Sequence, residues 1–216
     1  MNDTPDILIH PYRPADREAV RRICCDTADC GRPVESFFPD REVFADLITL
    51  YYTDYEPGSS WVAEQGGAVA GYLNGCLETR RFSRTMTLRI MPRLWLKSLR
   101  RGTLWHPQVR MLAWRSLGIW IRYGAGRSVD VSVFPSHLHV NLAADVRAHG
   151  IGHRLVERFC EQARAAGSAG IHANVREDNE AGRRFFERQG FRALFRRAVM
   201  RTETGMVYAV VYGKAL

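Results

Sequence analysis

The sequence predicts an α/β protein with a mixed central sheet of about seven strands flanked by helices. Short stretches with the period of a strand alternate with longer stretches of helical period. The 216 residues are 46% hydrophobic and 11% aromatic, which is enough for one sizeable core. Residues 137–191 read as strand, glycine turn, helix, strand and helix, in that order. We therefore expect a single domain over residues 1–216.

The strand and the first helix of that stretch have clear periods. Apolar and polar residues alternate along the strand, with Leu138, Val140 and Leu142 on one side and His139 and Asn141 on the other. After the turn, apolar residues recur every fourth position at Ile151, Leu155, Phe159 and Ala163. Gly150 and Gly152 thus lie where a strand becomes an amphipathic helix.

The glycine turn has two interpretations. Glycine tolerates positive φ and lets a ligand approach the backbone, and the unpaired N–H groups at a helix start attract phosphate. Alternatively, the glycines only make a tight turn. The turn is neither a P-loop, since no Lys-Ser or Lys-Thr follows, nor a dinucleotide fingerprint, since a third glycine is missing.

The segment after this helix supports the ligand interpretation. Gly167 to Gly170 ends the helix, and a strand follows at Ile171–Arg176. A short helix with a glycine stop contains Asn179, Gly182, Phe186, Gly190 and Phe191. Arg147-x-x-Gly150-x-Gly152 resembles the acetyl-coenzyme A motif of the GNAT N-acetyltransferases, and the five later residues fall at the spacing of a second GNAT motif.

The resemblance implies the GNAT fold and acetyl-CoA as cofactor. It implies that the backbone of Val140, Asn141 and Leu142 pairs with the pantetheine arm, and that Asn179 bonds the same arm. The pyrophosphate would lie on the turn and helix start, formed by Arg147, Ala148, His149, Gly150, Ile151, Gly152, His153 and Arg154. Gly182 and Phe186 would complete the cofactor side.

A finer resemblance is to the acetyltransferase-like C-terminal domain of O-GlcNAc hydrolases. It rests on Phe134-Pro-Ser136, residues 166–170 and the ending Val211 to Leu216. It suggests a free-standing bacterial relative of that domain. It also implies substrate contacts from one loop, at Tyr52, Asp54, Tyr55 and Glu56. The alternative is that this loop is only solvated.

Acyl transfer to an amine needs a base and, for the departing thiol, an acid. His137 and His139 are candidate bases because imidazole titrates near neutrality, although such histidines can be purely structural. Glu78, Asp54 and Glu56 could act through a water. Phe186 replaces the Tyr that in the family can protonate the thiolate, so that acid is absent or elsewhere. Tyr72 and Tyr208 are further phenols without an assigned place.

The remaining elements follow the chain. We expect a strand at Ile7–His10, helices at Arg17–Cys25 and Arg41–Tyr51, and a hairpin of Ser60–Glu64 with Ala68–Glu78. Two final strands, Arg192–Met200 and Gly205–Tyr212, complete the sheet. The last is apolar on both faces, which predicts a central strand.

Residues 80–127 form a basic insert. They hold twelve of the 31 Lys and Arg residues and no Asp or Glu, with four of the five tryptophans at 95, 105, 114 and 120. The spacing within Met91–Trp120 predicts two helices, with a break near Pro107. Such a segment could bind nucleic acid, an anionic membrane surface or an acidic protein. We favour an Arg-coated lid whose tryptophans pack on the core. Arg80, Arg81 or Arg84 could also hold cofactor phosphates.

The sequence thus predicts an acetyltransferase that moves an acetyl group from acetyl-CoA to a primary amine of a small molecule or a protein lysine. The alternative is a catalytically silent acetyltransferase-like module that binds a protein or nucleic acid through the insert. No apolar run is long enough to span a bilayer, so we expect a cytoplasmic protein. Five cysteines without C-x-x-C pairs suggest neither disulfides nor a metal site. We expect a monomer or a homodimer.

Overall fold

The computed structural model describes residues 7–123, 127–147, 150–201 and 205–216, and these contain all seven predicted strands. The strands are β1 (Ile7–Pro11), β2 (Ser60–Gln65), β3 (Ala68–Cys76), β4 (Ser136–Leu142), β5 (Gly170–Arg176), β6 (Arg192–Arg201) and β7 (Met206–Ala215). They form one sheet in the order β1-β2-β3-β4-β5-β7-β6. Only the β4–β5 pair is parallel, so the sheet is mixed. The predicted central position of the last strand is confirmed, since β7 lies between β5 and β6.

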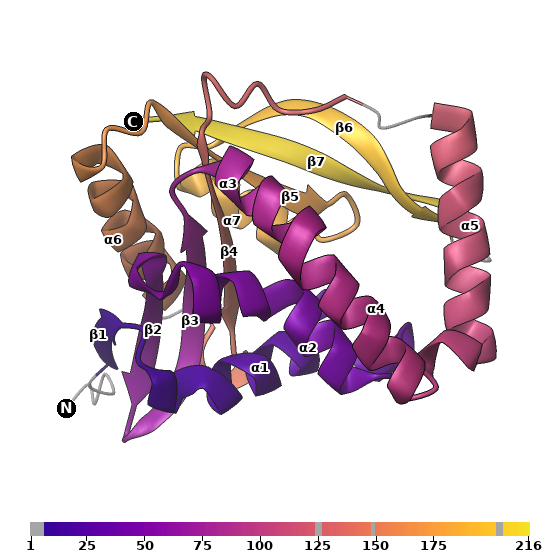
Figure 1. Ribbon diagram of the computed structural model, residues 1–216. Helices are drawn as coiled ribbons and strands as arrows, with labels where there is room; N and C mark the ends of the chain where they lie inside the picture. The colour runs from indigo at the N-terminus through magenta and orange to yellow at the C-terminus, as the bar shows by residue number, and fades with distance from the viewer. Residues whose placement is uncertain (1–6, 124–126, 148–149, 202–204) are drawn as a thin grey trace.

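Helices cover both faces of this sheet (Figure 1). They are α1 (Arg17–Asp26), α2 (Arg41–Leu50), α3 (Thr79–Thr85), α4 (Met91–Arg100), α5 (Pro107–Tyr123), α6 (Ile151–Ala165) and α7 (Glu180–Arg188). Short 3-10 turns lie at Pro14–Asp16, Val34–Ser36, Pro57–Ser59, Thr103–Trp105 and Ala144–Val146, and π-helical turns at Tyr51–Tyr55 and Met86–Ile90.

The alternation of side chains along β3 separates two cores. Leu73 points to the face covered by α6, where it joins Leu155 and Phe159 in the main hydrophobic cluster. Its neighbour Tyr72 points to the opposite face and packs with Val20 of α1. The sheet is therefore a layer between α6 on one side and α1 on the other.

The insert is helical, as predicted, but it begins earlier than the predicted pair. The strand expected to reach Glu78 ends at Cys76, and α3 starts at Thr79. A π-helical turn then joins α3 directly to α4. The break falls at residues 101–106, where Gly102 has φ of +73°, just before Pro107 starts α5. The structure thus confirms the two helices and adds a third one in front of them.

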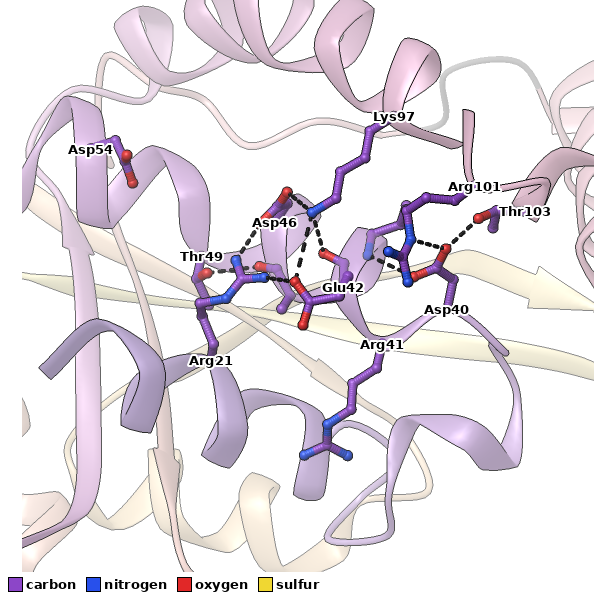
Figure 2. Close-up of polar contacts among 12 residues, drawn as sticks. Arg21, Asp40, Arg41, Glu42, Asp46, Thr49, Asp54, Lys97, Arg101 and Thr103 are labelled. Carbon is purple, nitrogen blue, oxygen red and sulfur yellow. Dashed lines mark hydrogen bonds and ion pairs between the residues drawn. The ribbon is translucent and has the colours of Figure 1, made fainter. Parts of the chain in front are cut away.

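Ion pairs hold α4 against α2 (Figure 2). The Lys97 ammonium lies 2.5 Å from the Asp46 carboxylate, which Arg21 of α1 also contacts. Arg101 donates to Asp40 over 2.8 Å, and the Thr103 hydroxyl donates to the same carboxylate. Lys97 of α4 and Arg101 just after it are therefore paired with carboxylates outside the insert.

The interpretation that the insert tryptophans pack on the core is wrong for three of the four. Trp95, Trp105 and Trp114 are 63%, 70% and 76% exposed. The buried side of α4 is formed instead by Leu94 and Ser98. Since successive helical residues are rotated by about 100°, Trp95 points away from that side. The side chain of Trp120 lies outside the described residues.

Candidate active site

The parallel strands β4 and β5 separate after only two paired positions. Their register is Ser136 with Ile171 and His137 with His172. Beyond that point β4 continues to Leu142 and β5 to Arg176 (Figure 1). Each strand stays paired on its outer side, β4 with β3 and β5 with β7. The result is a wedge in the middle of the sheet.

Beyond His137, the inner edge of β4 has no partner strand within the described residues. Val140 and Leu142, which were predicted to pair with the pantetheine arm, lie in this part of the strand. Strand backbones alternate N–H and C=O along each edge, so an extended amide chain could add to the inner edge. The side chain of Asn141 points to the opposite face from Leu142 and donates to the Tyr72 hydroxyl over 3.0 Å.

The turn that leads into α6 is open at Gly150 and filled at Gly152. Gly150 has φ of +74°, and a Cβ added there would meet nothing within 4 Å. A Cβ at Gly152 would lie 2.9 Å from the Phe185 ring, so that glycine serves packing between α6 and α7. The first turn of this 15-residue helix holds no acidic residue. The free N–H groups at its start therefore face no competing negative charge.

The polar side chains around this turn contact protein atoms. Arg147 donates to the carbonyl of Leu142 over 3.2 Å, and Arg154 donates to the carbonyl of Ile7 over 3.2 Å. His153 Nδ1 lies 2.6 Å from Gln189 Oε1. The predicted Ala148 and His149 lie outside the described residues. The backbone, more than these side chains, is thus the part of the turn that is available to phosphate.

The link between α1 and α2 reaches the end of β5 and the loop that follows β4. Asp29 accepts from Arg176 at the end of β5 over 2.6 Å. A Cβ at Gly31 would lie 2.9 Å from the Arg147 guanidinium. A cavity of about 560 Å³ lies beside this link, lined by Gly31, Ala143 and Arg147 among others. The link therefore borders the mouth through which a long cofactor would pass.

His137 is held by its neighbours at the closed end of the wedge. Its Nε2 lies 3.0 Å from the Tyr52 hydroxyl, and its Nδ1 lies 2.8 Å from Thr79 Oγ1. Phe82 packs edge-on against the ring at 4.6 Å. Burial, with smaller contributions from His172 and His139, lowers the pKa of His137 to about 3. This histidine is neutral and has both ring nitrogens occupied.

His139 has an unoccupied ring nitrogen. Its buried Nδ1 has no hydrogen-bond partner within the described chain. The side-chain amide of Asn74, its cross-strand neighbour, is likewise without one. Burial lowers the pKa of His139 to about 4. Because buried polar groups are normally hydrogen-bonded, this pair is suited to hold a polar ligand atom or water.

Most polar side chains of the predicted substrate loop already have partners within the protein. Glu56 accepts hydrogen bonds from Tyr51, Ser59 and the Leu77 N–H, all within 2.9 Å. Its role is therefore structural. Asp54 pairs with Arg17 at 2.5 Å, and the Tyr55 hydroxyl accepts from Arg93 at 2.6 Å. Of the four predicted residues, Tyr52 contacts β4, through His137. Glu78 is exposed at the start of α3.

The second motif has structural roles in α7. Asn179 Oδ1 accepts from the Gly182 N–H over 2.9 Å and caps the helix. A Cβ at Gly182 would lie 2.8 Å from the Asn179 amide, so glycine gives that cap room. Phe186 is buried against Phe191 and Tyr212. Its ring belongs to the core that supports the wedge.

Three residues around His137 escaped sequence reasoning. His172 pairs with it across the strands, and its Nδ1 lies 3.1 Å from the carbonyl of Phe134. Thr79 and Phe82 belong to α3 at the start of the insert, and no residue spacing indicated that they contact His137. For His172 a signal existed, because it is a titratable side chain on the polar side of the alternating strand Ile171–Arg176.

Comparisons with known proteins agree with this geometry. The family model "Acetyltransferase (GNAT) family" matches residues 30–191. The chain therefore belongs to the GNAT family of acetyltransferases, which use acetyl-CoA, and its fold is the GNAT α/β fold. The crystal structure of SsHAT is similar over 98% of both chains, with 27% identity and a TM-score of 0.74.

Two more distant structures share the fold. An acetyltransferase from Salmonella typhimurium, solved with acetyl-CoA, has 15% identity and a TM-score of 0.59 over 97% of this chain and 94% of its own. A ribosomal-protein-alanine N-acetyltransferase from Brucella melitensis has 20% identity and a TM-score of 0.58 over 97% and 99%. Within the described residues, no helix is long and apolar enough to cross a bilayer.

Proposed function

We propose that this protein transfers an acetyl group from acetyl-CoA to a primary amine, carried by a small molecule or by a protein lysine. The observation that carries the proposal is the wedge between β4 and β5, which opens toward the unobstructed turn at Gly150. An unpaired strand edge suits an amide chain, and an open helix start suits phosphates. When bound, acetyl-CoA supplies an activated thioester for attack by the amine.

The chain's own groups position the reactants and move the proton. Backbone groups of β4 from Val140 to Leu142 orient the pantetheine arm and offer donors where negative charge develops. His139 accepts the amine proton through Nδ1, directly or through a water. With a pKa of about 4 it is a weak base, so it acts only as attack makes the nitrogen acidic. Glu78 is the exposed alternative.

The leaving group needs no help from Phe186. Its ring carries no proton and is buried in the core. A thiol has a pKa near 8.5 and leaves readily as the anion. Activity therefore does not depend on the phenol found at this place in other family members.

The second candidate is a silent acetyltransferase-like module that binds a partner through the basic insert. Phe186 and the exposed insert favour it. The open turn at Gly150 disfavours it, since a domain without cofactor gains nothing from an unobstructed phosphate turn. The resemblance to the O-GlcNAc hydrolase C-terminal domain stays a prediction, and it does not identify the acceptor substrate.

Calorimetric titration of the protein with acetyl-CoA tests the proposal. We expect micromolar binding, followed by turnover in a screen of amines that includes lysine peptides. If the protein is folded by circular dichroism and gives no heat, the enzyme proposal is overturned and the silent module replaces it.

A further inference from the structure

Helix α5 presents an apolar side to solvent. Met111, Trp114, Leu117 and Ile121 share one side of the helix, and Trp105 precedes it by two residues. All five are exposed, Ile121 to 71%. We call these five residues the α5 outer face. Figure 1 shows α5 at the edge of the molecule, on the side away from α6.

Such a set of side chains is unusual on a water-facing helix. Isolated exposed apolar residues are common, but contiguous apolar patches mark surfaces that contact something. Helix α5 packs along β6, yet each of these five side chains stays at least 40% exposed among the described residues. The outer face is therefore not explained by packing within the described chain.

The insert that carries this face is strongly basic. Residues 80–127 carry twelve Lys and Arg and no carboxylate. Among the described residues, Lys97 and Arg101 form ion pairs with the acids of α2 and of its N-cap (Figure 2). Arg100 and Arg110 are exposed without such a pair among the described residues. An occupant of the α5 outer face must accept both apolar and cationic contacts.

This charge argues against a second copy of the chain. A twofold dimer through α5 would bring two identical segments together. Cations would then face cations, and neither segment offers a carboxylate to neutralise them.

The side-chain types argue against nucleic acid. Arginine and tryptophan suit phosphates and stacked bases. Three of the five residues, however, are the aliphatic or thioether side chains Met111, Leu117 and Ile121, which neither stack on bases as aromatic rings do nor pair with phosphates. Trp105 and Trp114 are 70% and 76% exposed, so their indoles are accessible to a partner.

We propose that α5 is an interfacial helix that docks the protein on an anionic membrane surface. Tryptophan and aliphatic side chains enter the boundary between headgroups and acyl chains, while the flanking arginines contact lipid phosphates. At 17 residues, α5 is about 25 Å long and lies along the surface rather than across it. The docking needs no acetyl transfer, so it is independent of the proposed function.

Vesicle co-sedimentation of the full chain tests this proposal. Vesicles of phosphatidylcholine with about a third phosphatidylglycerol should bind the protein, and pure phosphatidylcholine should bind it at least about tenfold more weakly. Binding should weaken as salt rises, because the anionic surface is screened. Tryptophan emission should shift to the blue as indoles leave water.

A double variant and a matched control locate the contact. Trp114→Ser with Ile121→Ser should lower the partition coefficient at least about tenfold. Leu8→Ser with Val133→Ser removes two apolar side chains, 56% and 48% exposed, outside the insert, and should leave binding unchanged. Both proteins should keep the circular dichroism spectrum and acetyl-CoA titration of the wild type.

Three outcomes would overturn the proposal. One is vesicle binding that the α5 double variant retains. Another is binding to duplex DNA in the absence of vesicle binding, which would assign the surface to a nucleic acid. The third is a dimer in solution that the α5 double variant splits, which would place a second copy on this face.

Discussion

The Tyr52 hydroxyl lies 3.0 Å from His137 Nε2 and joins the turn after α2 to the strand that lines the wedge. Burial, and then the nearby Cys76 and Glu56, raises the pKa of Tyr52, so the phenol keeps its proton. If the Tyr52 phenol donates to Nε2 of His137, the imidazole carries its proton on Nδ1 and donates it to Thr79 Oγ1. His137 is then fixed in one tautomer, and the free nitrogen at the site belongs to His139.

A His139→Gln variant tests which histidine is the base. We expect kcat/KM to fall about 100-fold, since general-base catalysis typically contributes at least that much. Tyr52→Phe removes only the hydroxyl bound to His137, and it should change kcat/KM less than about fivefold. Steady-state kinetics with the best amine from the screen provides both values. A larger effect of Tyr52→Phe than of His139→Gln would assign the proton transfer to the His137 side.

The same histidine should make the fold sensitive to acid. The pKa of His139 is about 4 in the folded protein and near 6.5 in an unfolded chain. Between these values the unfolded state binds more protons, so stability is full above about pH 6.5 and falls as the pH drops toward 4.

Urea unfolding at pH 7.5 and pH 5 measures this dependence. The loss of stability on acidification should be smaller in His139→Gln than in the wild type. His106→Gln, at an exposed position before α5, is the control and should behave as the wild type does. Equal losses in all three proteins would contradict the prediction.

Gly150→Val should abolish acetyl-CoA binding without unfolding the protein. A branched side chain at φ of +74° is strained, and it occupies the open turn in front of α6. The matched control is Gly167→Val, at the other end of the same helix, with φ of +77° and equally open space. Both variants should lose similar stability, about 1 to 2 kcal/mol. Only Gly150→Val should lose the heat of acetyl-CoA binding in the calorimetric titration.

Phe186→Tyr tests whether the absent phenol limits the rate. The ring lies against Phe191 and Tyr212 in a buried cluster, so an added hydroxyl must displace a neighbour or stay without a partner. We expect about 1 to 3 kcal/mol lower stability and no rise in kcat. A rise in kcat of tenfold or more would show that the thiolate needs an acid after all.

The parts of the fold with strict periods were predictable from the sequence. Alternating apolar residues from Leu138 to Leu142 predicted β4, and apolar residues at every fourth position from Ile151 to Ala163 predicted α6. The predicted ends of both elements are within one or two residues of the observed ones. The apolar character of both faces of β7 placed it inside the sheet. Such patterns indicate which side of a helix or strand is buried, and this can be read from residues that are close in the sequence.

The contacts of the site were not predictable in the same way. Thr79 and Phe82 reach His137 only because α3 folds back over β4, which no spacing within the insert indicates. Glu56 looked like a free carboxylate, but the N–H of Leu77, 21 residues further along the chain, donates to it together with Tyr51 and Ser59. Gly152 looked like part of the phosphate turn, whereas its missing Cβ makes room for Phe185 from the next helix. Each depends on residues far away in the chain.

The carboxylate that anchors the insert gives the last prediction. Asp40 caps α2 by accepting from the Val43 N–H and also accepts from Arg101 and Thr103 (Figure 2). Burial acts to raise the pKa of Asp40, but the hydrogen bonds from Arg101, Thr103 and Val43 outweigh it, so the pKa is lowered. Its contribution to stability is therefore present above about pH 4, the unfolded value, and is lost as the pH falls through the folded pKa.

Asp40→Asn keeps a capping group but removes the charge that Arg101 contacts. We expect the free energy of unfolding to drop by about 1 to 2 kcal/mol at pH 7, and the difference from the wild type to shrink at pH 3, where the wild-type carboxylate begins to be protonated. Glu35→Gln is the control, because Glu35 pairs with Arg41 at 3.1 Å on the surface, where such pairs contribute little. A difference for Asp40→Asn that stays constant from pH 7 to pH 3 would mean that the charge does not hold the insert, and that shape and capping do.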